Sequence, residues 1–148
     1  MKGIDAITEA IIGDAISVHR QLGPGLLEST YEACVAALLS RCGMRIKRQV
    51  AMPVVFEGET LDCGYRLDML VEDRVVVELK TVAKLEPVHF SQMMTYLKLS
   101  GCTVGLLINF NVTRLMDGLR RVVRGYDAPT SANSSSFASS AIDSVGRG

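Results

Sequence analysis

The stretch RLDMLVEDRVVVELK, residues 66–80, decides the fold. Its two apolar halves are separated by a polar segment of three residues, 72–74, a length that is common in β-hairpin loops. The first half ends a strand expected over residues 62–71, and the second begins a strand expected over 75–82. The second strand is nearly continuous in apolar character, which indicates a central strand covered on both faces. In the first strand, side chains alternate between a face with Tyr65, Leu67, Met69 and Val71 and a face with Gly64, Arg66, Asp68 and Leu70.

Three charged side chains of this hairpin form the candidate site. Glu78 and Lys80 are two residues apart in a strand and therefore share a face. A loop of three residues places Asp68 opposite Glu78 and Arg66 opposite Lys80, whereas a loop of two residues sends Glu78 to the other face. We predict the first register because only it brings both carboxylates together, at a Cβ separation of ~4.5–5.5 Å. One divalent cation could bridge them and relieve their repulsion. The same spacing also fits an exposed hairpin with a Glu–Lys surface pair.

The rest of the chain supplies helices and further strands around the hairpin. The apolar periodicity and the Gly and Pro positions predict helices over 4–22, 27–42 and 86–100, and strands over 45–56, 103–110 and 115–124. A turn is expected at residues 57–59, and another at Asp117-Gly118. A helix between two buried strands indicates a crossover, so we expect an α/β fold with a mixed central β-sheet flanked by helices. Residues 1–126 are expected to form this domain, and the Ser-rich residues 127–148 a disordered tail.

Other polar residues fall at positions where they could join the site. Glu28 precedes Tyr31 and Val35 by three and seven residues, which puts it on the predicted core-facing stripe of its helix. It either caps the positive N-terminal end of that helix or faces the carboxylates. Gln92 and Tyr96 are one turn apart on the helix that follows the hairpin, so they project to one side. They could orient a phosphate or a water, or form an ordinary half-buried polar edge.

Composition limits the function classes. A chain of 148 residues with 48% hydrophobic residues suits one domain with a real core. It has no apolar run of the ~18 residues that span a bilayer and no secretory signal, so we expect the cytoplasm. The four cysteines lack the C-x-x-C spacing typical of zinc sites. Zero net charge weighs against strong non-specific nucleic-acid binding. Two local basic clusters, Arg45, Lys47 and Arg48, and Arg120, Arg121 and Arg124, fit either a basic surface or solvated faces.

A motif near the N-terminus resembles a known family. Gly25-Leu-Leu-Glu28-Ser-Thr-Tyr31 fits G-x-x-E-x-x-Y and resembles the GxxExxY protein family, which is placed in the PD-(D/E)XK nuclease superfamily. Gln92-Met-Met-Thr-Tyr96 is similar to the Q-x-x-x-Y motif of the RecB-like exonuclease branch. Further similar pieces are His19-x-x-Leu22-Gly23-Pro24-Gly25, Leu67-Asp68, Val77-Glu78-Leu79-Lys80 and Leu107-Ile108-Asn109-Phe110. The resemblance covers roughly residues 4–125, and its specificity rests on the combination of motifs.

The resemblance implies a restriction-endonuclease-like core and a metal-dependent nuclease that hydrolyses phosphodiester bonds. The ligands it implies for Mg²⁺ or Mn²⁺ are Asp68, Glu78, the backbone carbonyl of Leu79, and Glu28. The catalytic residues it implies are Asp68, Glu78, Lys80 and Glu28. Gln92 and Tyr96 would position substrate. Arg66, expected beside Lys80, could contact a phosphate or form a salt bridge to an acid.

The expected partner is a nucleic acid, with DNA favoured, and no membrane. A domain of this size has little surface for a long duplex, so a homodimer or an accessory protein is also expected. One alternative is a non-catalytic nucleic-acid- or protein-binding module that retains the nuclease fold. Another is a structural subunit of a larger complex.

Overall fold

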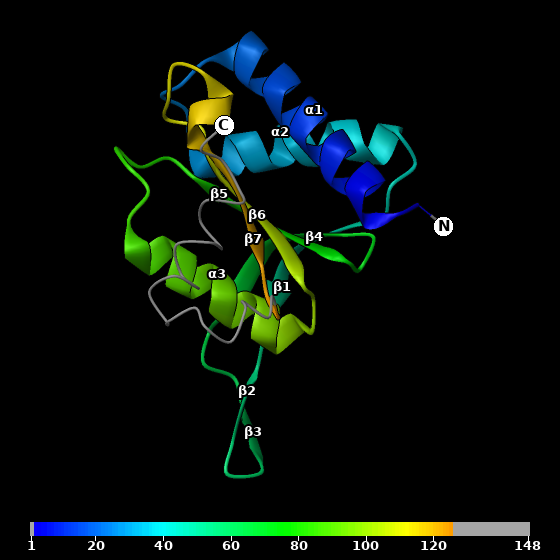
Figure 1. Ribbon diagram of the computed structural model, residues 1–148, viewed down its shortest axis with the longest axis vertical. Coiled ribbons are helices and arrows are strands. Elements are labelled where there is room, and N and C mark those ends of the chain that lie inside the picture. The colour runs from blue at the N-terminus through cyan, green and yellow to red at the C-terminus, as the bar shows by residue number, and fades with distance from the viewer. Residues whose placement is uncertain (1, 126–148) are drawn as a thin grey trace, which may run out of the picture.

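The computed structural model describes residues 2–125 (Figure 1). The predicted tail, residues 127–148, lies outside the described residues. The helices are α1 (Ile4–Leu22), α2 (Glu28–Arg41) and α3 (Pro87–Ser100), and a short 3₁₀ helix, η1, covers Leu115–Gly118. The strands are β1 (Ile46–Ala51), β2 (Val54–Phe56), β3 (Glu59–Leu61), β4 (Arg66–Val71), β5 (Val75–Lys80), β6 (Val104–Asn109) and β7 (Leu119–Val123). Within residues 2–125, no helix combines the length and the apolar character that crossing a membrane requires.

Five strands form the central sheet, in the order β1-β4-β5-β6-β7. β5 and β6 run parallel, and the other neighbours run antiparallel. The parallel pair is connected by α3, because parallel neighbours cannot be joined by a tight turn. The predicted crossover and the predicted α/β fold with a mixed sheet flanked by helices are both confirmed.

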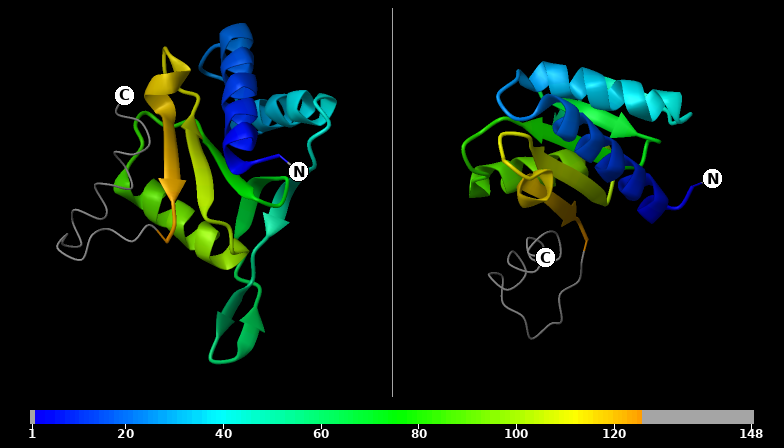
Figure 2. Two further views of the ribbon diagram at one scale, coloured as in Figure 1. Left: turned by 45° about the vertical axis from the view of Figure 1, so that its right-hand side comes forward. Right: turned by 90° about the horizontal axis from the view of Figure 1, so that it is seen from above.

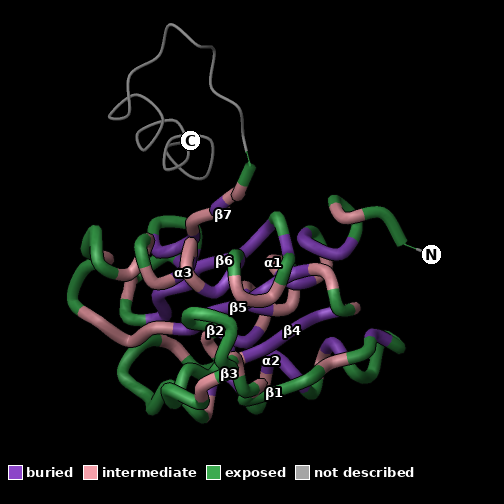
Figure 3. The backbone as a smooth tube through the Cα atoms, turned by 90° about the horizontal axis from the view of Figure 1, so that it is seen from below, coloured by how far each residue is buried: buried purple, intermediate pink, exposed green. Residues whose placement is uncertain are grey.

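Helices cover both faces of this sheet (Figure 2). α1 and α2 pack on one face, where Ile11, Tyr31 and Leu39 join Val77 of β5 in one buried cluster. α3 packs on the other face, where Met93 and Leu97 join Val76 of β5 in a second cluster. β5 is therefore buried on both sides, as its apolar sequence predicted (Figure 3). Polar groups on so buried a strand need specific partners.

Two predicted strands are interrupted. The strand predicted over residues 45–56 divides into β1 and β2 around Pro53, because proline has no N–H for a ladder hydrogen bond. β2 pairs with β3 in a separate two-stranded sheet that projects from the body of the domain (Figure 1). Its turn holds Glu57 and Gly58, both with positive φ (49° and 78°), as hairpin turns of two residues require. The strand predicted over residues 62–71 begins only at Arg66.

Helix ends and the last strand follow the sequence closely. α1 ends at Leu22, where the Gly23 N–H donates to the His19 carbonyl. α3 starts with Pro87 after a capping box formed by Glu86 and His89. The expected turn at Asp117-Gly118 is part of η1, and β7 follows it as the edge strand expected within residues 115–124.

Candidate active site

The loop of the central hairpin has the predicted length, because Val71 pairs with Val75. Backbone pairing continues to Met69 and Val77 and then stops. Asp68 and Glu78 follow in the same register, and there the side chains replace the ladder hydrogen bonds. The Asp68 N–H donates to Glu78 Oε2 at 2.8 Å. The Leu79 N–H donates to Asp68 Oδ2 at 2.9 Å. Both carboxylates therefore lie where β4 and β5 separate.

The environment of this pair disfavours two negative charges. Glu78 is 3% exposed. Its burial, and next to it the charge of Asp68, raise the Glu78 pKa from 4.5 to about 8, against the hydrogen bond from the Asp68 N–H and the charge of Lys80. The pKa of Asp68 is also raised, mainly by burial, and the Leu79 N–H partly offsets this. At neutral pH the pair therefore holds a proton that a cation could replace.

Lys80 is connected to α3 by side-chain hydrogen bonds. Its Nζ donates to Gln92 Oε1 at 3.0 Å, and Gln92 Nε2 donates to Tyr96 Oη at 3.2 Å. Tyr96 is 5% exposed. Burial raises the Tyr96 pKa first, followed by the charges of Glu78 and Asp68. The structure thus brings the two predicted residues of α3 next to Lys80 and the carboxylates.

Glu28 does not lie on the buried face of α2, contrary to the prediction. It is exposed, and it makes no capping hydrogen bond, but it lies in the first turn of α2, where a negative charge is favourable. Partial burial of the carboxylate raises its pKa, followed by the charge of Asp68, while the charge of Lys80 lowers it. Glu28 therefore stands at the margin of the site. The glutamate that α2 does bury is Glu32, which lies one turn further along the helix and is 6% exposed.

Arg66 is not beside Lys80. The pairing between β4 and β5 ends before it, and Arg66 instead pairs with Ala51 on the other side of β4. Its guanidinium lies 3.9 Å from the Asp62 carboxylate, and both side chains are exposed. Of the two roles considered for Arg66, the structure shows the salt bridge, and contact with a phosphate stays a prediction. The predicted register is correct at the loop but does not continue to this residue, because the two strands diverge at Asp68.

Glu32 and Gln49 are site neighbours that the sequence reasoning missed. Gln49 Nε2 donates to Glu32 Oε1 at 2.7 Å and approaches Asp68 Oδ1 at 3.4 Å. The backbone of Gln49 has φ +50°, a conformation that costs a non-glycine residue on the order of 1–3 kcal/mol. Spacing could have found Glu32, which lies three and seven residues before the buried Val35 and Leu39. No sequence signal marks Gln49.

Tyr31 and Asn109, which belong to the motifs of the resemblance, hold backbone segments near the site in place. The Tyr31 hydroxyl donates to the Gly23 carbonyl and accepts from the Leu26 N–H at 3.1 Å. Asn109 accepts the Val82 N–H at 3.1 Å and donates to the Val82 carbonyl at 2.9 Å. This amide therefore fixes the chain just beyond Lys80. Gly118 packs so closely that a Cβ there would meet the Asn109 carbonyl oxygen at 2.2 Å.

The donor chemistry fits a hard divalent cation. Asp68, Glu78 and the Leu79 carbonyl supply oxygen atoms, which Mg²⁺ and Mn²⁺ prefer. The raised pKa values of both acids indicate that two negative charges are unfavourable here and that a cation would stabilise them. Among residues 2–125, no three His, Cys, Asp or Glu side chains are arranged as a metal site by themselves. The carbonyl oxygen and solvent would therefore have to complete the ligand set.

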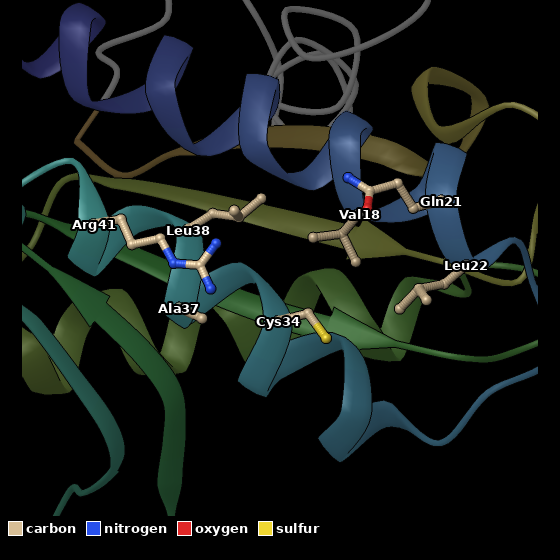
Figure 4. Close-up of a pocket in the computed structure, with 7 residues that line it drawn as sticks. All are labelled: Val18, Gln21, Leu22, Cys34, Ala37, Leu38 and Arg41. Carbon is tan, nitrogen blue, oxygen red and sulfur yellow. The ribbon is translucent and has the colours of Figure 1, made fainter.

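The groove between α1 and α2 is a separate feature. It is lined by Val18, Gln21, Leu22, Cys34, Ala37, Leu38 and Arg41 (Figure 4). None of the predicted site residues lines it. The carboxylate pair therefore lies outside this groove.

Comparison with known proteins agrees with this geometry. The family model of the PD-(D/E)XK nuclease superfamily matches residues 5–122, which is most of the chain. Searches of curated proteins and of solved structures found no match. The mixed five-stranded sheet with helices on both faces is consistent with a restriction-endonuclease-like core. With its acidic pair and lysine on the central hairpin, the chain belongs to the PD-(D/E)XK nuclease superfamily.

Proposed function

We propose that this protein is a metal-dependent nuclease that hydrolyses phosphodiester bonds of nucleic acid, with DNA as the expected substrate. Membership of a nuclease superfamily supports this function class. The observation that carries the proposal is the pair formed by the half-buried Asp68 and the buried Glu78. The Lys80 ammonium lies on the same strand as Glu78 and donates to Gln92. Acids with raised pKa values beside a lysine are concentrated at catalytic sites, which supports the proposal.

Asp68, Glu78 and the Leu79 carbonyl would hold Mg²⁺ or Mn²⁺, with Glu28 at the margin of the site able to bind directly or through water. The chemistry that such an ion supplies is Lewis acidity, which lowers the pKa of a water and offsets phosphate charge. Glu78 must lose its proton before its carboxylate can serve as a ligand, because its pKa is raised to about 8. The burial of Glu78 strengthens the electrostatic interactions of its carboxylate.

Lys80 would act on the attacking water or on the phosphate. One of its N–H groups is engaged by Gln92 Oε1 at 3.0 Å, and an ammonium has three donors. The others can orient the water, assist its deprotonation or stabilise charge in the transition state. Gln92 and Tyr96 would position substrate. Gln92 would also orient the Lys80 ammonium through its hydrogen bond. Arg66 is exposed and lies 3.9 Å from Asp62, a weak surface ion pair that leaves its guanidinium able to contact a phosphate.

Two finer assignments belong to the same proposal. Glu28 and Tyr31 support placement in the GxxExxY family, and the hydrogen-bonded Gln92 and Tyr96 support the RecB-like branch. A homodimer or an accessory protein would extend the surface available to a nucleic acid, and sedimentation of the protein with and without DNA measures this.

The test is cleavage of labelled single- and double-stranded DNA and RNA with Mn²⁺, with Mg²⁺ or with EDTA. Asp68→Asn and Lys80→Met should each reduce metal-dependent cleavage by about 10²–10⁴-fold. Asp73→Asn, in the exposed hairpin loop, and Lys98→Met, in the last turn of α3, are matched controls that should retain it.

A second measurement separates catalysis from binding. Mn²⁺ should bind the wild type and Lys80→Met but not Asp68→Asn. If the folded wild type cleaves no substrate and binds no Mn²⁺, the non-catalytic module becomes the better account of this protein.

A further inference from the structure

The pairing between β1 and β4 is interrupted at one position. Arg48 pairs with Met69, and Val50 pairs with Leu67, but no pair joins the residues between them, Gln49 and Asp68. Gln49 has φ +50°, in the left-handed region that non-glycine residues rarely adopt. Such a conformation persists only where surrounding contacts impose it, and it is concentrated at functional sites. The contacts of Gln49 therefore need an explanation.

The burial pattern shows that both strands change face at this point. Ile46 packs with the cluster under α1 and α2, whereas Val50 packs with the cluster under α3. Met69 and Leu67 divide between the two clusters in the same way. In a regular strand, residues an even number apart share a face, so our expectation that Leu67 and Met69 face the same way was wrong. The distortion turns Gln49 toward α2 and Asp68.

The Gln49 amide connects two carboxylates. Its nitrogen donates to Glu32 Oε1 at 2.7 Å and lies 3.4 Å from Asp68 Oδ1, which is the weaker of the two contacts. The other Glu32 oxygen accepts from Arg48 Nε at 2.8 Å. The other Asp68 oxygen accepts from the Leu79 N–H. Asp68 is therefore oriented from both sides, by Gln49 of β1 and by the backbone of β5.

We propose that Gln49 is a positioning residue for Asp68, and that the buried Glu32, paired with Arg48, holds the Gln49 amide in place. A carboxylate that binds a cation must be held in one orientation, and groups beyond the ligands usually provide this. A glutamine suits the position because its two N–H bonds can serve two acceptors at once. The proposal concerns Asp68 in the metal-free protein and rests on the proposed nuclease function only where metal binding is measured.

A purely structural role would make different predictions. In that case the Gln49 amide would only satisfy the buried charge of Glu32, and its loss would lower stability without changing Asp68. The Leu79 N–H distinguishes the two roles, because it donates to Asp68 Oδ2 and does not contact Gln49 or Glu32. Its NMR chemical shift and its hydrogen exchange report the orientation of Asp68 without metal and without activity.

The experiment compares Gln49→Met, which has similar length and no donor, with Gln49→Gly, which lacks the amide but tolerates the positive φ. Both should shift the Leu79 amide resonance and weaken Mn²⁺ binding by about 10–100-fold. Gln21→Met is the matched control, because Gln21 is exposed and its side chain donates only to Ser17 among the described residues. It should change neither measurement. Using both Gln49 variants covers the case in which the methionine variant does not fold.

Glu32 is tested by a double-mutant cycle. Glu32→Gln should shift the Leu79 resonance more in the wild type than in Gln49→Met, because the effect that passes through Gln49 is lost and only the direct charge effect of Glu32 on Asp68 remains. An unchanged Leu79 amide in both folded Gln49 variants overturns the proposal, even if Mn²⁺ affinity falls. A shifted amide in a protein that binds no Mn²⁺ supports the positioning role and instead contradicts the metal-dependent function.

Discussion

The Asp68 N–H donates to Glu78 Oε2 at 2.8 Å, at the point where β4 and β5 stop pairing. The Leu79 N–H makes the corresponding bond to Asp68 Oδ2 from the opposite strand, at 2.9 Å. Each carboxylate therefore takes the place of a ladder hydrogen bond, and removing either one leaves a backbone N–H without its partner. Folding and chemistry are coupled at these two residues, so substitutions there affect both.

Glu78 should make the metal-free protein less stable as the pH rises toward 8. Its folded-state pKa of about 8 lies above its ordinary value of 4.5. Between these values the folded state keeps a proton that the unfolded state has released, so the free energy of unfolding falls with rising pH. The stabilisation is complete below 4.5 and is lost as the pH passes through about 8. The slope is at most about 1.4 kcal/mol per pH unit.

Urea unfolding with EDTA at several pH values from about 5 to about 8 measures this slope. Glu78→Gln should flatten it, because glutamine has no proton to lose. The raised pKa values of Asp68 and Glu28 act in the same direction. Glu72 has a lowered pKa, so its contribution has the opposite sign and falls in the acid range, and Glu72→Gln should leave the slope unchanged. Equal slopes for the wild type and Glu78→Gln would contradict the assignment.

Binding of Mn²⁺ should release a proton below about pH 8, because the ion replaces the proton on Glu78. Calorimetric titrations in buffers of different ionisation enthalpy count the released protons. The affinity should increase with pH up to about 8 and then level off. Glu78→Gln should bind more weakly and release no proton from this position. Proton release that is the same in Glu78→Gln would mean that another group is responsible.

Gln92→Leu should lower the cleavage rate by about 10–100-fold, because hydrogen bonds to charged groups are worth about 1.5–3 kcal/mol and Lys80 loses its acceptor. Mn²⁺ affinity should not change, since Gln92 contacts neither carboxylate through a hydrogen bond within residues 2–125. Gln21→Leu on the exposed part of α1 is the control. If Gln92→Leu cleaves DNA at the wild-type rate, Gln92 has no role in the reaction.

Gly118→Ala should destabilise the fold by about 1–3 kcal/mol, the usual range for overpacking. The added Cβ would meet the Asn109 carbonyl oxygen at 2.2 Å, so the backbone must move. Because the Asn109 side chain fixes Val82 next to the site, Mn²⁺ binding should weaken as well.

Gly13→Ala is the control for this substitution. Gly13 lies within α1, and a Cβ added to it would meet nothing within 4 Å among the described residues. Alanine there should stabilise the protein by about 0.5–1 kcal/mol. Thermal unfolding of both variants gives the comparison, and a Gly118→Ala protein as stable as the wild type would contradict the close packing.

Local sequence was sufficient for the central hairpin and for the architecture. Three polar residues between two apolar runs set the loop length and, with it, the register from Val71–Val75 to Met69–Val77, which Asp68 and Glu78 follow. The helix between two buried strands predicted the parallel pair of β5 and β6. The one-turn spacing of Gln92 and Tyr96 predicted that they share a side of α3. These inferences held because each depends on periodicities of a few residues.

Only the tertiary structure decided which residues surround the acidic pair. Glu28 and Glu32 are one turn apart on the same helix, and the packing of α2 against the sheet determines that Glu32 is the buried one. Arg66 lies away from Lys80 because β4 and β5 separate where carboxylates replace their backbone bonds. The positive φ of Gln49 arises from contacts with residues 17 and 19 positions away along the chain. Contacts so distant in sequence leave no local periodicity, so they exist only once the chain has folded.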